Sequence, residues 1–297
     1  MRKRTLPFTL PPFKFDRATR RLWKDLFVSV GALACVAIAL VPLVSILFEA
    51  GSRGLQAIQP GLFLFDTRDG GIGNAIQGTL ILVALSSGVA LPVGILTGIY
   101  LAEFGKGPVG NGVRFFVDVM TQIPSIVVGI FAYSLILTLA FSGLVGTRLV
   151  FSTITGVIAL ATIMIPFVAR TSEEALRLVP VSTREAALAL GIPRYRSILR
   201  VVLPSSASGL ITGALLGVAR VAGETAPLLV TALGSLYGFA GLDQPVESLP
   251  HTIYTFGLSP SSAENQAAWG ASLILVLIML TISIASRVIV RLRSVSE

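Results

Sequence analysis

The stretch SSASGLITGALLGVARVAGETAPLLVTAL, which begins at Ser205 and ends at Leu233, decides how the rest of the chain folds. It is long enough to cross a bilayer and carries only two charged residues, Arg220 and Glu224. These residues are four positions apart and therefore share one face of a helix. Charges inside an apolar segment are costly unless something satisfies them. The stretch therefore predicts a membrane helix whose charged stripe faces protein or a water-filled space.

The composition of the whole chain agrees with a polytopic membrane protein. Of its 297 residues, 54% are hydrophobic and 13% are charged, and the mean hydropathy is +0.84. Soluble domains carry about 25% charged residues. One cysteine, Cys35, and one histidine, His251, exclude an internal disulfide and argue against a zinc or haem site, so no metal is expected. The net charge of +8 does not indicate a nucleic-acid partner, because basic residues at membrane edges set topology.

Apolar runs predict an all-α fold with six transmembrane helices. Within the third run Pro124 is expected to interrupt the helix, and Asp118 to lie near a helix N-terminus, where a carboxylate is favourable. Pro227 is expected to kink the fifth span. The stripe of Gly209, Gly213 and Gly217 predicts close packing between helices. The six predicted spans cover about residues 26–48, 75–101, 115–141, 153–168, 205–233 and 267–284.

The distribution of basic residues predicts that both termini are cytoplasmic. With six spans, nineteen Lys and Arg residues fall on the side of the termini and three on the other side. An excess of this kind marks the cytoplasmic side. The first tail, residues 1–25, holds eight of the nineteen and is also suited to contact anionic membrane lipid. No cleavable signal peptide is expected, since the first apolar run follows this polar tail.

The largest predicted cytoplasmic loop contains VSTREAALALGIPRYRSILRVVLP, residues 181–204. Ser182 and Glu185 have the spacing of a helix capping box. Gly191 and Pro193 are expected to stop this first helix, and a second helix is expected from near Tyr195 to Pro204. The simplest interpretation is a connecting loop. Two ordered helices with apolar side chains instead favour a surface that meets another protein.

The residues of this loop resemble those of a known family. Six positions match the EAA loop of ABC importer permease subunits, with Val201 in place of the usual isoleucine: Glu185, Ala186, Ala187, Gly191, Leu203 and Pro204. The resemblance implies a type I ABC importer permease domain over residues 74–286, with a coupling loop at 182–204 that seats on a separate ATPase subunit. It also implies that the chain is not an enzyme and binds no cofactor, because ATP-Mg is bound by the partner. Residues 26–48 are then a preceding helix, and 287–297 a cytoplasmic tail.

Three further segments narrow the resemblance to permease subunits of the inorganic phosphate importer: GIYLAEF (98–104), IPSIVVG (123–129) and ARVAGETAPLL (219–229). In that family the partners are a second permease (PstC), two ATPase subunits (PstB) and an outer phosphate-binding protein (PstS), at the cell (inner) membrane. Charged residues at the positions of Arg220 and Glu224 are associated there with phosphate passage. The candidate pathway residues are therefore Arg220, Glu224, Thr225 and Arg170.

Physical reasoning supports Arg220 as an anion contact. Sixteen residues separate Pro204 from Arg220, which is about 24 Å of helix and places the guanidinium near or beyond the bilayer midplane. A guanidinium matches phosphate oxygens, and Glu224 would keep the site from holding the anion too tightly. One continuous span would then link the coupling loop to the anion pathway. The alternatives are a structural Arg220–Glu224 pair, and a topology anchor at Arg170.

Other functions remain open at this level. The acidic outer loop with Asp243, Glu247 and Glu264 is expected to dock a binding protein. A permease for sulfate or molybdate would carry the same coupling loop. An intramembrane protease is unsupported, because the sequence has no suitable Ser/His or Asp/Asp pair for catalysis within its spans. A membrane scaffold or sensor without transport is a further alternative, whereas the coupling loop disfavours a channel that works without ATP.

Overall fold

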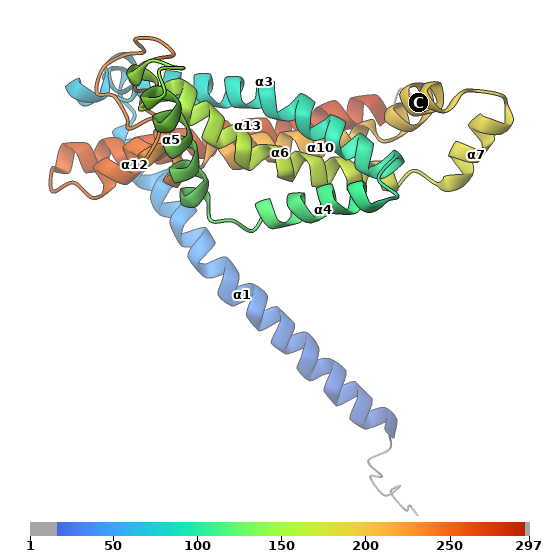
Figure 1. The fold of residues 1–297 in the computed structure, drawn as a ribbon. Helices are drawn as coiled ribbons and strands as arrows, with labels where there is room; N and C mark the ends of the chain where they lie inside the picture. The colour runs from blue at the N-terminus through green and yellow to red at the C-terminus, as the bar shows by residue number, and fades with distance from the viewer. Residues whose placement is uncertain (1–16, 295–297) are drawn as a thin grey trace, which may run out of the picture. The chain divides into compact units, whose positions relative to one another are not determined.

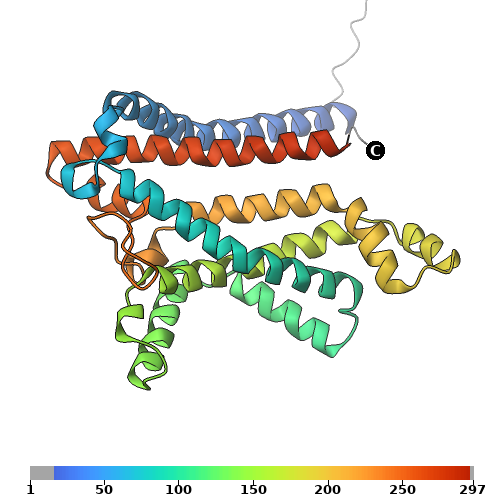
Figure 2. The same cartoon turned by 90° about the horizontal axis from the view of Figure 1, so that it is seen from above.

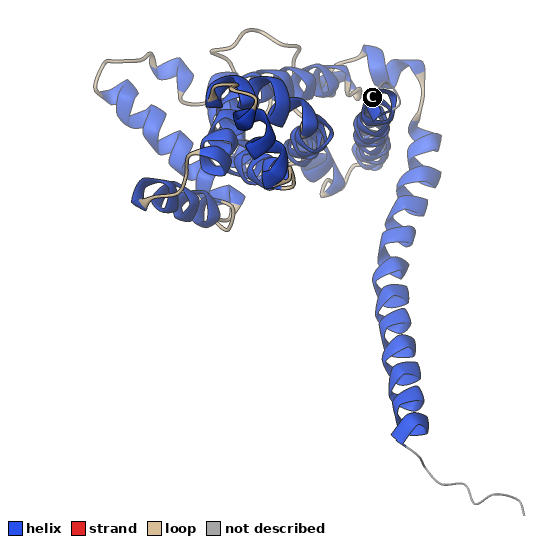
Figure 3. Cartoon of the chain, turned by 90° about the vertical axis from the view of Figure 1, so that its right-hand side faces the viewer, coloured by secondary structure: helices blue, strands red, loops and turns tan. Residues whose placement is uncertain are grey.

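The computed structural model describes residues 17–294, which are helices and loops apart from one isolated bridge between Leu233 and Val246 (Figure 3). Two units make up the chain, Met1–Glu49 and Ala50–Glu297. Helix α1 (Arg17–Ala57) begins in the first unit and ends in the second. Its part in the first unit is exposed and strongly apolar from residue 26 to residue 48, as a lipid-facing helix would be. Residues 1–16 of the predicted basic tail and residues 295–297 of the C-terminal tail lie outside the described residues.

The centre of the second unit is a pair of long helices, α3 (Gly73–Glu103) and α6 (Thr153–Arg177), which pack along each other (Figure 1). Helix α10 (Ala207–Ala222) packs on α6 and on α13 (Ser262–Ser294) (Figure 2). The short helix α12 (Leu249–Gly257) packs on α13. The short helix α2 (Pro60–Leu64) and the turn η1 (Thr67–Asp69) precede α3, and the turn η2 (Thr147–Leu149) precedes α6.

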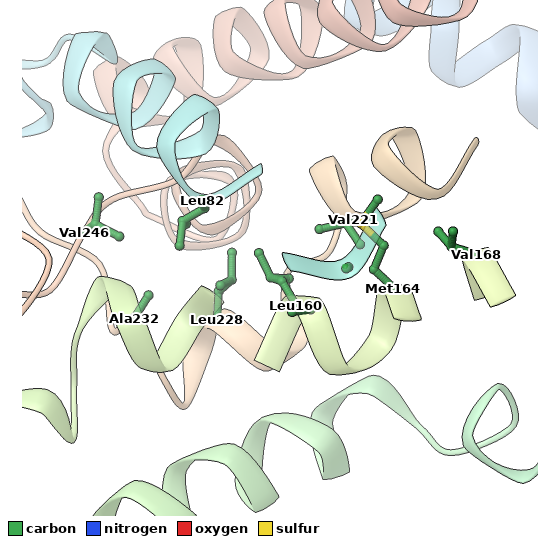
Figure 4. Packing of buried hydrophobic residues seen from close by; sticks show 10 residues of the cluster. Leu82, Leu160, Met164, Val168, Val221, Leu228, Ala232 and Val246 are labelled. Atoms are coloured by element: carbon green, nitrogen blue, oxygen red, sulfur yellow. The ribbon is translucent and has the colours of Figure 1, made fainter. Parts of the chain in front are cut away.

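Aliphatic side chains from α3, α6, α10 and the short helix α11 (Ala226–Leu229) form the main core (Figure 4). Leu82, Leu160, Met164, Val221 and Leu228 are all almost fully buried there. Because lipid tails are as apolar as these side chains, they stabilise the helix bundle by close van der Waals packing and not by leaving water. The core therefore holds α6 in the centre, with the predicted charged segment on one side of it.

The predicted spans are largely confirmed. Four helices in the described residues are long and apolar enough to cross a membrane, and there are six spans if each of two bent helix pairs counts as one. Helices α1, α3, α6 and α13 correspond to the first, second, fourth and sixth predicted spans. The two bent pairs correspond to the third and fifth spans. The interruption expected at Pro124 in the third span is confirmed, whereas the prediction of a continuous helix is wrong for the fifth.

The third span divides into α4 (Pro108–Met120) and α5 (Ser125–Phe141), which are bent by 107°. Pro124 lies at this break, because proline lacks a backbone donor and disfavours helical geometry in the preceding residue. Helix α4 starts at Pro108, seven residues before the predicted start of the third span at residue 115. As a result, Asp118 lies near the C-terminal end of α4, and its predicted place near a helix N-terminus is wrong.

The fifth span is bent by 70° at Ser206, between the helical segment Arg194–Ser205 and α10. The Ser206 hydroxyl donates to the carbonyl oxygen of Val202 at 2.9 Å, a local bond that competes with helix hydrogen bonding. Helix α10 then ends at Ala222, so Pro227 lies in the first turn of α11 instead of kinking a longer helix. The predicted continuous link from the loop to the charged residues is therefore wrong.

The glycine stripe of α10 packs inside the chain, against α6. A Cβ atom at Gly213 would lie 2.7 Å from Thr171 Oγ1, and one at Gly209 would lie 2.8 Å from Ala175 Cβ. At Gly217 the nearest atom would be Val168 Cγ2, at 3.0 Å. The stripe lets α10 approach α6 closely, in the manner of small-residue packing between membrane helices.

Substitution of Gly213 by alanine is expected to destabilise the protein by about 1–3 kcal/mol, since the added methyl group forces the two helices apart. The melting temperature of the purified chain in detergent measures this effect. Gly112→Ala on α4 is the control, because no atom lies within 4 Å of its added Cβ. That substitution is expected to be neutral or to stabilise by up to about 1 kcal/mol. Equal melting temperatures for the two variants would contradict the packing.

Candidate functional site

Arg220 and Glu224 meet where α10 ends. Arg220 lies in the last turn of α10, and Glu224 lies beyond Gly223 in the connection to α11. Arg220 Nε is 3.8 Å from Glu224 Oε1, too long for a hydrogen bond. The Arg220 side chain is 51% exposed, whereas that of Glu224 is 16% exposed. The pair predicted from spacing is confirmed as a loose ion pair, in which most of the guanidinium remains accessible.

The guanidinium of Arg220 also lies beside an aromatic ring that the sequence did not single out. Its Cζ atom is 5.8 Å from the centroid of the Phe167 ring on α6. This is within the range of a cation–π interaction. Thr225, also predicted for the pathway, is half-buried, and its carbonyl oxygen accepts from the backbone nitrogens of Leu228 and Leu229. The structure therefore places Thr225 at the start of α11 and shows Phe167 as the neighbour of Arg220.

Arg170 is held differently from Arg220. Its Nε is 2.9 Å from Glu174 Oε1, and its Nη1 is 3.3 Å from Asp118 Oδ1, which joins α6 to α4. Helix α6 continues seven residues beyond Arg170, so this residue does not mark the end of the helix. Arg170 is three residues, or about 5 Å of helix, from Phe167. In the described part of the chain, no ion pair or hydrogen bond joins Arg170 to Arg220.

A buried carboxylate next to Arg170 anchors α4 to α6. Glu173 is 2% exposed, and its Oε1 lies 2.8 Å from Arg114 Nε and 2.7 Å from Arg177 Nη2. The other oxygen, Oε2, has no hydrogen-bond partner among the described residues. One carboxylate therefore faces two guanidinium groups. The four-residue spacing of Glu173 and Arg177 could have been recognised in the sequence, but Arg114 is 59 positions away.

The predicted loop forms two helical segments joined by a glycine turn. These are α7 (Val181–Ala189) and a second segment composed of α8 (Arg194–Ser197), the π-helical turn η3 (Ile198–Val202) and α9 (Leu203–Ser205). Gly191 has a φ of +75°, which favours glycine and ends the first helix as predicted. The capping box is wrong: the N-cap is Pro180, so α7 begins before Ser182, and no side chain caps it. Glu185 is exposed.

Arg184 anchors this loop to the rest of the unit. Its Nη2 is 2.9 Å from Oε1 of Glu103, a 7% exposed residue at the end of α3. Nη2 also donates to the carbonyl oxygen of Leu176 at 2.7 Å, and Nη1 donates to that of Val179. The loop is therefore fixed to α3 and α6 by one charged pair and two backbone contacts.

Apolar side chains are left exposed on the outer faces of the loop. Figures 1 and 2 show α7 at one end of the helical unit, away from the loop at 233–248. Ala187 of the predicted motif is buried, whereas Ala186 is exposed, and Leu203 and Pro204 belong to α9. Large exposed apolar residues of this region are Val181, Leu188, Leu190, Tyr195 and Leu199. A surface of this kind is typical of a contact with another protein.

The loop at the opposite end is organised by Glu247, which is only 4% exposed. Its Oε1 is 2.7 Å from His251 Nδ1 and accepts from Thr252 Oγ1 at 3.0 Å, while Oε2 accepts from the Ser235 backbone nitrogen at 3.1 Å. The Ser248 backbone nitrogen also donates to Oε1, at 3.1 Å. The interpretation of Glu247 as part of a docking surface is therefore wrong, since a buried carboxylate with four partners is structural. Asp243 is exposed.

Comparison with known proteins assigns the chain to a class of transporters. The family model described as "Binding-protein-dependent transport system inner membrane component" matches residues 94–294. A chain of a bacterial alginate ABC transporter, solved with an alginate-bound periplasmic protein, aligns with a TM-score of 0.66 at 17% identity, covering 91% of this chain and 96% of that one. A chain of the MetNI methionine ABC transporter aligns with a TM-score of 0.55 at 20% identity, over 80% and 99%. These two matches confirm the fold.

Curated relatives show to which branch of this transporter family the chain belongs. The phosphate transport system permease protein PstA of Yersinia pestis is 39% identical over 283 residues, which cover 92% of this chain and 93% of the relative. The probable PstA protein of Methanocaldococcus jannaschii is 39% identical over 277 residues, covering 91% and 94%. The chain therefore belongs to the family of binding-protein-dependent transport system inner membrane components, in the branch of the PstA phosphate transport permeases.

Proposed function

We propose that the chain is the transmembrane permease subunit of an ATP-driven importer and forms, with a second permease, the pathway for inorganic phosphate. The observation that carries this proposal is the half-exposed Arg220 side chain, whose Nε lies 3.8 Å from Glu224 Oε1, in a chain that is 39% identical to a PstA phosphate permease. Permeases for sulfate or molybdate are the alternative, and the curated relatives do not favour it.

The geometry suits transient binding of an anion. A guanidinium offers several N–H donors in one plane, which match two phosphate oxygens at once. The Arg220 guanidinium makes no hydrogen bond within the described residues, so its N–H donors are available to an anion. Glu224 is close enough to compete for the guanidinium once the phosphate moves on. The loose pair would therefore allow both binding and release of the anion. A tight ion pair would resist binding, and an isolated arginine would resist release.

Helix α6 is the element best placed to couple the loop to this site. The loop contacts α6 through the carbonyl oxygen of Leu176, and α10 lies against α6 along its glycine stripe. Phe167 of α6 then adjoins Arg220. Because the fifth span is bent at Ser206, movement of the loop would reach Arg220 through the packing of α6 on α10. The Arg170 contact with Asp118 adds a second connection, from α6 to α4.

The loop at residues 182–204 would bind a separate ATPase subunit. Its exposed apolar side chains and the exposed Glu185 offer an accessible surface, and ATP-Mg would be bound by that partner. The excess of basic residues on the loop side supports a cytoplasmic position for the loop and for both termini. An outer phosphate-binding protein would deliver the anion at the opposite face. These partners would assemble on the permease domain at residues 74–286.

Replacement of Phe167 by leucine is expected to raise the apparent KM for phosphate uptake about fivefold, since a cation–π contact contributes about 1 kcal/mol. Phe167→Tyr keeps an aromatic ring and is expected to retain the original KM. Uptake by cells that express each variant measures the difference, with membrane levels of the protein as the control. An equal KM for the leucine and tyrosine variants would show that the ring does not position Arg220.

Co-purification tests the proposed assembly. The tagged chain, extracted in mild detergent from a host that expresses its own transport operon, is expected to bring down an ATPase and a second permease. ATP hydrolysis by the reconstituted assembly is expected to rise when phosphate-loaded binding protein is added. Isolation of the chain without an ATPase, under conditions that preserve a known importer, would contradict the proposal.

A further inference from the structure

A second basic site lies away from Arg220, beside the loop that includes α7 and α8. We infer that this pocket binds a phosphate group, carried either by an anionic lipid or by free phosphate. The pocket has a volume of about 510 Å³ between the end of α3, the end of α6 and the loop. We call it the loop-side pocket, and its charged lining residues are Lys106, Arg177, Arg184, Arg194, Glu103 and Glu185.

The charge of the loop-side pocket favours an anion. Four of its charged lining residues are basic and two are acidic, which leaves an excess of two positive charges. Glu103 opposes an anion only weakly, because it is buried and paired with Arg184 at 2.9 Å. Glu173 behind the pocket faces both Arg114 and Arg177, so one carboxylate is shared by two cations. The local excess therefore remains after the ion pairs are considered.

Three of the basic residues keep hydrogen-bond donors available. Lys106 is exposed, and its ammonium group has no hydrogen bond or ion pair within the described residues. Arg194 donates one Nη2 bond to the Glu103 carbonyl oxygen, and its Cζ lies 4.6 Å from the centroid of the Phe104 ring, which together hold it over the pocket. Arg177 is 56% exposed and uses Nη2 for Glu173. Since arginine has five N–H donors and lysine three, most of them remain for a ligand.

The position and the apolar wall of the pocket suit an amphiphilic ligand. Glu103 is the last residue of α3, a membrane-spanning helix, so the pocket lies at the depth of lipid headgroups on the side that we propose is cytoplasmic. Basic pockets at this depth bind anionic headgroups. Two aliphatic lining residues that are not buried, Ala102 and Leu188, could contact an acyl chain. Free phosphate would bind the same basic residues but would make no contact with these aliphatic side chains.

The test compares a pocket variant with a charge-matched control in the assembled transporter. The double variant Lys106→Gln/Arg194→Gln removes two lining charges, and Arg196→Gln removes a charge on α8 that does not line the pocket. Native mass spectrometry of the delipidated complex, titrated with phosphatidylglycerol, measures lipid binding. Equilibrium dialysis with radiolabelled inorganic phosphate, on the complex without its binding protein, measures the free anion.

The expected result is that affinity for one of the two probes falls about fivefold per removed charge in the double variant and is unchanged in Arg196→Gln. A loss of affinity for phosphatidylglycerol identifies a lipid headgroup as the source of the bound phosphate group. A loss of affinity for inorganic phosphate identifies the free anion as the ligand. Unchanged binding of both probes in the double variant, or an equal loss in Arg196→Gln, would overturn the inference. Phosphate uptake by the wild-type complex tests the proposed function separately, so the two can fail independently.

Discussion

Arg220→Gln is expected to reduce phosphate uptake by about one to two orders of magnitude while the transporter still assembles. The substitution keeps a polar side chain with N–H donors but shortens it and removes the charge that would bind the anion. Charge-assisted hydrogen bonds contribute about 1.5–3 kcal/mol each, which sets the size of the effect. Uptake of radiolabelled phosphate, normalised to the amount of complex recovered from membranes, measures it.

Two controls separate transport from structure in this experiment. Arg148→Gln removes an exposed arginine from the turn η2 and is expected to leave uptake unchanged. The variant Arg220→Leu/Glu224→Leu removes both charges, and a merely structural pair could be replaced in this way at little cost. We expect the double variant to assemble but not to transport. Full uptake in either Arg220→Gln or the double variant would show that the pair does not lie on the phosphate pathway.

Arg184→Leu is expected to destabilise the protein by about 3–5 kcal/mol and to weaken binding of the ATPase. The substitution leaves the Glu103 carboxylate buried without its partner, and an uncompensated buried charge is strongly destabilising. It also removes the donors to the Leu176 and Val179 carbonyl oxygens. The melting temperature in detergent and the yield of co-purified ATPase are the two measurements.

The matched control for Arg184 is the double variant Glu103→Leu/Arg184→Leu. Replacement of both members of a buried ion pair is often nearly neutral, so this variant is expected to recover most of the lost melting temperature. It should not recover the ATPase yield fully, because the backbone contacts of the loop are still missing. A double variant as unstable as Arg184→Leu would indicate that the loss comes from packing and not from the unpaired carboxylate.

The apolar runs predicted most of the fold because a membrane span needs a long apolar helix. Helices α3, α6 and α13 follow directly from such runs, and Gly191 ends α7 as its residue type predicts. The 70° bend at Ser206 could not be predicted in this way. Pro204 is compatible with the first turn of a helix, and serine residues are common in membrane helices.

The candidate site was predictable only where its partners are close in the sequence. Arg220 and Glu224 are one turn apart, and their pairing followed from that spacing. Phe167 gave no signal, because it is one of many apolar residues in α6, and its role depends on the packing of α6 against α10. Glu247 was predicted to lie on a docking surface because it is acidic and stands in a loop, but its charge gives no sign that the side chain is buried.

The most direct test of the central claim is phosphate uptake by proteoliposomes that contain the chain with its second permease and ATPase subunits. With ATP on the side of the coupling loop and phosphate-loaded binding protein on the other side, radiolabelled phosphate is expected to accumulate. Excess unlabelled phosphate should abolish this accumulation, and excess sulfate should leave it unchanged. Accumulation that needs no ATP, or that sulfate suppresses as strongly as phosphate does, would contradict a phosphate import pathway through this chain.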